Sequence, residues 1–257
     1  LLQNLIAQTD AALEDVPIEY TKPAEGATTS YDTNTRTTGD KTVNYLMAYL
    51  LTKGLDGYEA KNQKYLEKTI EFVKGSLSYP FWGTLGYQNN DLAGGQQLFS
   101  VAMVYNWLKD ELKDVTCDHT MGTDGTDWST VVTYEDQPIL EAMEMRLWQA
   151  GRDMYSRNYD YDVYVMNHLH VRMAGLFGAA IALREQEDLT AEEKAELVKW
   201  TGMALYKTGV AMHSLMPDGT SQEGLPYWEY AAEFLIRSGV NAELSLGIDV
   251  FGMTSVF

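Results

Sequence analysis

Residues 91–108 read DLAGGQQLFSVAMVYNWL, and the helical pattern of this stretch is typical of most of the chain. Asp91 suits the N-cap of a helix, where a short acidic side chain accepts hydrogen bonds from free backbone amides. The run that follows is apolar and predicts a helix. Gly94 and Gly95 each cost that helix about 1 kcal/mol relative to alanine, so we expect either close packing or the close approach of a ligand to explain them.

Helical periodicity also dominates the segments on either side. The predicted helices cover residues 1–13, 41–53, 58–77, 91–112, 138–157, 167–183, 191–215 and 227–238. Polar, turn-rich loops are expected at residues 21–40, 78–90, 116–128 and 158–166. Only residues 130–134 have the alternation of a short strand. Helices in sequential pairs without a sheet predict one all-α domain over residues 1–257, arranged as an array or ring rather than a four-helix bundle.

The composition restricts the functions open to the chain. With 257 residues, of which 45% are hydrophobic, it is long enough to bury a full core. A formal net charge of −18 argues against nucleic-acid binding and against an anionic membrane surface, because the field repels both. The single cysteine, Cys117, excludes an internal disulfide and a thiolate metal cluster. Residues 1–8 have neither the segments of a signal peptide nor the pattern of a membrane span.

Two of the four histidines lie in the sequence Asn-His-Leu-His at residues 167–170, where a helix is predicted to begin. His168 and His170 are too close in sequence to share one face of that helix, and no third ligand is near, so no metal site is predicted. From Gly175 onward the helix is rich in small residues, which favour tight interior packing. Such packing would hold the polar start of the helix firmly at a cleft.

Residues 217–230 read PDGTSQEGLPYWEY. This stretch is a glycine-containing turn followed by aromatic residues at the predicted start of another helix. Gly224 permits a positive φ, and Pro226 suits a first helical position. The first turn of this helix is expected to carry Tyr227, Trp228 and Tyr230. Aromatic rings that line a groove stack on sugar faces, and tyrosine hydroxyls bond to sugar hydroxyls, so the motif predicts a carbohydrate site. The aromatic and acidic loop at residues 158–164 favours the same interpretation.

Three segments carry a family resemblance. The first is DLAG at residues 91–94 followed by AMVYNWL at residues 102–108, the second is the Asn-His helix at residues 167–183, and the third joins Asp-Gly at residues 218–219 to EGLPYWEY at residues 223–230. Together and in this order, they resemble the helical catalytic domain of the heparinase II/III-like polysaccharide lyases, a superfamily that includes oligoalginate lyases. The resemblance covers most of the chain.

The resemblance implies an α/α toroid, an incomplete barrel of helical hairpins, with the family's C-terminal β-sandwich as a partner domain outside this sequence. Asn106 and Met166 stand where the family usually has aspartate and asparagine. The implied reaction is β-elimination at a uronic acid: the proton α to the carboxylate is removed, and the glycosidic oxygen at C4 leaves. No cofactor and no metal are implied.

The resemblance also assigns roles to particular residues. Asn167 and His168 would neutralise the carboxylate, and Tyr227, with Tyr230 second, would act as acid and base if its surroundings lower its pKa. Glu223 would orient the loop before the helix. The full set of expected substrate contacts is Trp82, Asn90, Asp91, Gln97, Tyr164, His170, Glu223 and Trp228.

Two other functions stay open at this stage. A glycoside hydrolase with an α/α barrel needs two carboxylates that face each other across a cleft, and Asp91 and Glu223 are the candidates. A non-catalytic glycan-binding domain would hold sugar without cleaving it. The expected partner is a uronate-containing polysaccharide or oligosaccharide of heparin or heparan sulfate-like, chondroitin-like or alginate-like type. The resemblance implies a periplasmic or secreted bacterial protein whose signal is not present in this chain.

Overall fold

The computed structural model describes residues 2–18, 30–83, 89–123, 131–160, 163–164, 166–214 and 223–253. These residues are mostly helical, which confirms the predicted all-α class, and none of their helices is long and apolar enough to span a membrane. The elements are α1 (Leu2–Ala11), α2 (Ser30–Thr52), α3 (Glu59–Leu77), α4 (Leu92–Trp107), α5 (Lys109–Leu112), β1 (Thr116–Thr123), β2 (Val131–Pro138), α6 (Ile139–Asn158), α7 (Asn167–Leu183), α8 (Ala191–His213), α9 (Leu225–Leu246) and the short 3-10 helix η1 (Phe251–Met253).

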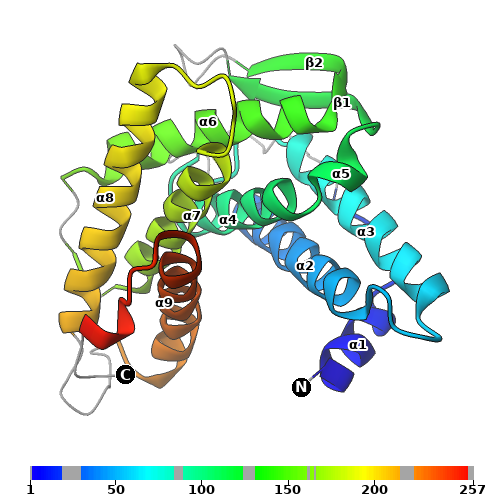
Figure 1. Ribbon diagram of the computed structural model, residues 1–257, viewed down its shortest axis with the longest axis horizontal. Coiled ribbons are helices and arrows are strands. Elements are labelled where there is room, and N and C mark those ends of the chain that lie inside the picture. Colours follow the sequence, from blue (N-terminus) through cyan, green and yellow to red (C-terminus); the bar gives the residue numbers. More distant parts are fainter. Residues whose placement is uncertain are drawn as a thin grey trace.

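The long helices alternate between inner and outer positions (Figure 1). Helices α3, α6 and α8 lie on the periphery, and α2, α4, α7 and α9 lie inside them. The inner helices contact one another in chain order, α2 with α4, α4 with α7, and α7 with α9. Among the described residues, α2 and α9 share no extensive contact. The inner helices therefore form an open arc.

The inner helices also run in the same direction. Asp40, in the first half of α2, contacts Gln96 near the start of α4, whereas Tyr49 near the end of α2 contacts Glu111, which follows the end of α4. The starts of α4, α7 and α9 are joined by the hydrogen bonds described below. The N-terminal ends of the inner helices therefore gather at one end of the molecule.

Helices α4 and α7 pack so closely that their backbones meet at glycine. A Cβ atom on Gly175 would lie less than 3.0 Å from the carbonyl oxygen of Gly95, and one on Gly95 would lie 2.7 Å from the carbonyl oxygen of Val171. A Cβ atom on Gly94 would also lie less than 3.0 Å from the carbonyl oxygen of Asn89, which folds back over the first turn of α4. Close packing, one of the two reasons anticipated from the sequence, therefore accounts for both glycines of α4.

Two predictions about loops are wrong. Residues 30–40, expected in a loop, form the first half of α2, and residues 116–123, also expected in a loop, form β1. The first half of α2 shows no apolar stripe because several of its buried positions are small or polar, namely Thr35, Thr38 and Gly39. Strand β1 is stabilised by antiparallel pairing with β2 and by burial of Cys117, neither of which shows as regular alternation.

Candidate functional site

The N-terminal ends of α4 and α7 carry a polar cluster around Asp91 and His168. The Asp91 Oδ1 atom lies 3.2 Å from His168 Nδ1 and 3.4 Å from Arg172 Nη2. Arg172 follows His168 by four residues, so the two side chains share one face of α7, and Nη2 lies 3.5 Å from His168 Nδ1. Arg172 Nη1 donates to Asn158 Oδ1 at 3.3 Å. These four residues are named the Asp91 cluster.

The backbone of Asp91 is in a conformation that residues with a side chain rarely adopt. Its φ is 98°, in the region that favours glycine. Asp91 occupies the N-cap of α4, as predicted, but its carboxylate makes no capping hydrogen bond and contacts His168 and Arg172 instead. Such strain is concentrated at functional sites, where the surrounding structure holds a side chain in a required position.

The charge state of Asp91 fixes the tautomer of His168. Burial alone would raise the pKa of Asp91, but hydrogen bonds from His168 and the Leu92 amide, together with the charges of His168 and Arg172, lower it below its ordinary value. The ionised carboxylate only accepts hydrogen bonds, so His168 Nδ1 carries a proton and donates to it. In the neutral imidazole, the lone pair then lies on Nε2, which is left as an acceptor. The His168 side chain is 33% exposed, so the ring is open to solvent.

Buried polar side chains of α6 hold the segment before α4 in place. Asn158 Nδ2 donates to Asn90 Oδ1 at 2.7 Å, while Asp153 Oδ2 accepts from the Asn89 backbone amide at 2.9 Å. Asn90 is only 6% exposed. It therefore supports the Asp91 cluster from beneath, rather than forming the direct substrate contact that was expected.

Glu223 joins the start of α7 to the start of α9. Its Oε2 atom accepts from the Asn167 backbone amide at 2.6 Å and lies 3.2 Å from Asn167 Nδ2. That amide belongs to the free N-terminal end of α7, so Glu223 satisfies it from outside the helix. The next residue, Gly224, has φ 88° and caps α9, with Pro226 in the first positions as predicted. The turn at residues 218–219 lies outside the described residues.

The two candidate acid–base tyrosines occupy different environments. The Tyr230 hydroxyl lies 3.4 Å from Gln96 Oε1, and burial raises the pKa of Tyr230 to about 12. Tyr230 therefore keeps its proton at neutral pH, contrary to the lowered pKa that a base requires. Tyr227 is 57% exposed, and Trp228 is half-buried against the core. Only Tyr227 and Trp228 fall in the first turn, because α9 begins at Leu225, two residues earlier than predicted.

Three residues predicted as substrate contacts, Trp82, Gln97 and His170, are buried in the interior. Trp82 is fully buried, and its indole N–H donates to the carbonyl of Ser76 at 2.9 Å. Gln97 is also fully buried and donates to the carbonyl of Thr35, which ties α4 to α2. His170 is 4% exposed. None of these side chains has a face open to a ligand, so they stabilise the fold instead.

The arginines near this end of the molecule were not predicted from the sequence. They are Arg172 in the Asp91 cluster and Arg36 on α2, while Arg237 lies farther along α9. Each lies close to a carboxylate, Arg172 to Asp91, Arg36 to Asp40 and Arg237 to Glu233. Arg172 had a recognisable signal, since it is the one Lys or Arg in the otherwise apolar run of residues 167–183. Tyr164, predicted as a contact, is half-buried, with the Lys207 ammonium 5.7 Å from its ring centroid.

His170 is expected to make the stability of the fold depend on pH. Burial lowers its pKa from 6.5 to about 4, so below pH 6.5 the unfolded chain takes up a proton that the folded chain refuses. The free energy of unfolding should therefore fall by about 3 kcal/mol between these values as the pH decreases. Urea unfolding of His170→Leu should lose this part of the slope, and an unchanged slope would contradict the assignment.

The arrangement places an oriented imidazole and a neighbouring guanidinium at the N-terminal end of α7. Such a group can accept a proton and stabilise negative charge that develops on a bound molecule. In the part of the chain that the structure describes, no three His, Cys, Asp or Glu side chains are grouped so that they could hold a metal ion. No protein-family model matches this chain, and no curated protein matches it significantly.

Proposed function

We propose that this chain is the helical catalytic domain of a polysaccharide lyase that cleaves uronate-containing glycans by β-elimination. The observation that carries the proposal is the Asp91 cluster, an oriented and solvent-accessible histidine beside a buried arginine at the shared N-terminal end of the inner helices. The open arc of inner helices, each adjacent to an outer helix, supports an α/α toroid. Heparin or heparan sulfate-like, chondroitin-like and alginate-like chains are the substrate candidates.

The reaction requires three groups. The proton α to a carboxylate is weakly acidic, so positive charge must stabilise the enediolate that forms, and the Arg172 guanidinium beside His168 provides it. His168 Nε2 is the base that removes the proton, since Nδ1 is committed to Asp91. Tyr227 is the acid that protonates the leaving oxygen, because it is the more exposed of the two tyrosines. Asn167, held by Glu223, positions the start of α7.

A hydrolase is the weaker alternative. Its two carboxylates, Asp91 and Glu223, are both engaged by neighbouring groups, Asp91 by His168 and Arg172 and Glu223 by Asn167. The lowered pKa of Asp91 also makes it a poor proton donor at neutral pH.

Elimination creates a conjugated, unsaturated uronate, so ultraviolet absorbance tests the proposal. We expect absorbance to rise when the protein is incubated with one member of a panel of uronate polysaccharides. Tyr227→Phe should lower the initial rate at least 100-fold, whereas Tyr230→Phe should retain kcat. New reducing ends without absorbance would indicate hydrolysis, and binding without either product would indicate a glycan-binding domain. Loss of kcat in Tyr230→Phe alone would transfer the acid role to Tyr230.

A further inference from the structure

A second polar cluster lies across the inner arc, farther along α4 from the Asp91 cluster. It is formed by residues of α2, α4 and α9: Arg36, Asp40, Gln96, Tyr230, Glu233 and Arg237. Gln96 follows Asp91 by five residues, which is about 7–8 Å along a helix. This group is named the Gln96 cluster.

Gln96 contacts both α2 and α9 through the nitrogen and the oxygen of its side-chain amide. Its Nε2 atom donates to Asp40 on α2, and its Oε1 atom lies 3.4 Å from the Tyr230 hydroxyl on α9. The Arg36 guanidinium of α2 lies 5.3 Å from the centroid of the Tyr230 ring. These contacts link two helices that otherwise share no extensive contact among the described residues.

Arg237 fixes the α9 side of the cluster. It is paired with Glu233 one turn earlier, and its guanidinium lies 5.1 Å and 4.9 Å from the ring centroids of Phe99 and Phe234. Its planar group is therefore held against apolar rings. A guanidinium fixed in this way loses little side-chain freedom when it donates to a ligand.

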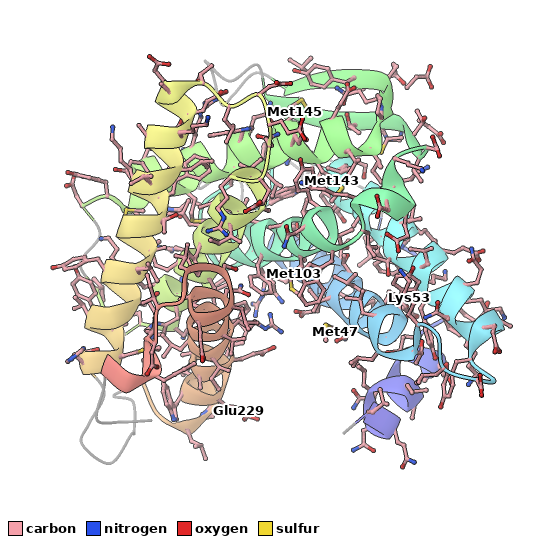
Figure 2. The ribbon with its side chains drawn as sticks, viewed as in Figure 1. Met47, Lys53, Met103, Met143, Met145 and Glu229 are labelled. Carbon is pink, nitrogen blue, oxygen red and sulfur yellow. The ribbon has the colours of Figure 1, made fainter. Side chains whose placement is uncertain are left out.

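The Gln96 cluster is open to a ligand. Asp40 is exposed, and the protein atoms around its carboxylate raise its pKa by desolvation. Arg237 also lines a cavity of about 460 Å³ between α2, α4, α7 and α9. Met47 of α2 and Met103 of α4 line the same cavity and lie in the space between α2 and α9 in Figure 2. The cluster therefore adjoins a largely apolar cavity at Arg237, and polar groups beside an apolar surface suit the hydroxyls and the C–H face of a sugar ring.

The charge balance of the cluster indicates which chemistry it binds. Arg36 and Arg237 are balanced by Asp40 and Glu233, so a sulfate or carboxylate would be opposed by two carboxylates and a cation by two guanidiniums. A pair of neighbouring hydroxyl groups meets no such penalty, because it donates to a carboxylate and accepts from a guanidinium at the same time. The Asp91 cluster differs, because it holds one carboxylate beside both a guanidinium and an imidazole.

We propose that Asp40, with Arg36, Gln96 and Tyr230, forms a second sugar subsite that binds vicinal hydroxyl groups of a pyranose ring next to the uronate. The proposal rests on the proposed function for the position of the uronate. Asp40 binds this ring through its carboxylate, and Tyr230 orients Gln96 rather than transferring a proton. The subsite adds binding energy for longer chains and touches no reacting atom.

Asp40→Ala tests the subsite, with Glu229→Ala as the matched control. Both changes remove one exposed carboxylate from a helix, but Glu229 lies outside the Gln96 cluster, at the end of α9 opposite Leu246 (Figure 2). For uronate oligosaccharides long enough to occupy both clusters, Asp40→Ala should raise KM about tenfold or more and leave kcat unchanged. On the shortest cleaved substrate, and in Glu229→Ala, both constants should stay at the wild-type level. An equal rise in KM for short and long substrates would overturn the proposal.

Calorimetric binding separates this proposal from the lyase assignment. The probes are a panel of neutral oligosaccharides and sodium sulfate, each titrated into the wild type and Asp40→Ala. We expect a neutral oligosaccharide to bind the wild type and to lose about tenfold in affinity in the variant, whether or not elimination is observed. Elimination with no effect of Asp40→Ala on any ligand would contradict the subsite alone. Sulfate binding that strengthens when Asp40 is removed, without binding of a neutral sugar, would show an anion site and overturn the proposal.

Discussion

His168→Gln is expected to lower kcat on a uronate polysaccharide by roughly 100- to 10,000-fold, the usual contribution of a positioned general base. Glutamine fills a similar space and can still donate to Asp91, but it has no imidazole nitrogen to accept the substrate proton. The side chain is 33% exposed at the start of α7, so the free energy of unfolding should stay close to that of the wild type. Initial rates from absorbance and urea unfolding measure the two quantities.

His213→Gln is the matched control for this change. His213 is exposed at the end of α8, and its Nδ1 atom lies 2.8 Å from the carbonyl of Gly209, far along the chain from the Asp91 cluster. Its replacement should leave kcat unchanged. Asp91→Asn should approach the effect of His168→Gln, because an amide can donate to Nδ1 and favour the wrong tautomer. Wild-type kcat in His168→Gln would contradict the role of His168 as base.

Gly175→Ala is expected to destabilise the fold by about 3 kcal/mol or more. The added Cβ atom would lie less than 3.0 Å from the backbone carbonyl of Gly95, which no side-chain rotation can relieve. Helices α4 and α7 would have to separate, and the contacts that hold Asp91 beside His168 would change with them. Urea unfolding measures the loss of stability, and the absorbance assay measures the loss of activity below the unfolding midpoint.

Gly202→Ala supplies the contrast. Gly202 lies within α8, where an added Cβ atom meets nothing within 4 Å, so the change should stabilise the helix by about 1 kcal/mol through propensity alone. Both variants make the same chemical change within a helix. Equal stability of Gly175→Ala and Gly202→Ala would show that the helices can separate without cost and that the contact at Gly95 does not limit their packing.

Helices with a regular apolar stripe were predictable from the sequence. The expected ranges 58–77, 138–157 and 167–183 differ from α3, α6 and α7 by at most one residue at each end. The first half of α2 was missed because the buried positions described there, Thr35, Thr38 and Gly39, carry no hydrophobic signal. Strand β1 was missed because it is stabilised by pairing with β2, and the residues of β1 alone do not indicate that pairing.

The candidate site was predictable in part. Asp91, Asn167, His168 and Glu223 come from three separate segments, and the structure brings them together in two adjoining pairs. Trp82, Gln97 and His170 were misplaced because residue type does not reveal whether an aromatic or polar side chain faces a cleft or the core. Arg36 and Asp40 gave no signal, since charges on one helix resemble a solvated face until a second helix is placed opposite them.

Helices α4 and α7, locked together at Gly95 and Gly175, carry Asp91 and His168, whereas α2 and α9 stand at the two open edges of the arc. Helices α2 and α9 each contact this central pair on one side only. A small tilt of α2 or α9 therefore disturbs fewer contacts than a displacement of α4 or α7. The contact between Asp91 and His168 therefore depends on the central pair of helices and not on the position of α2.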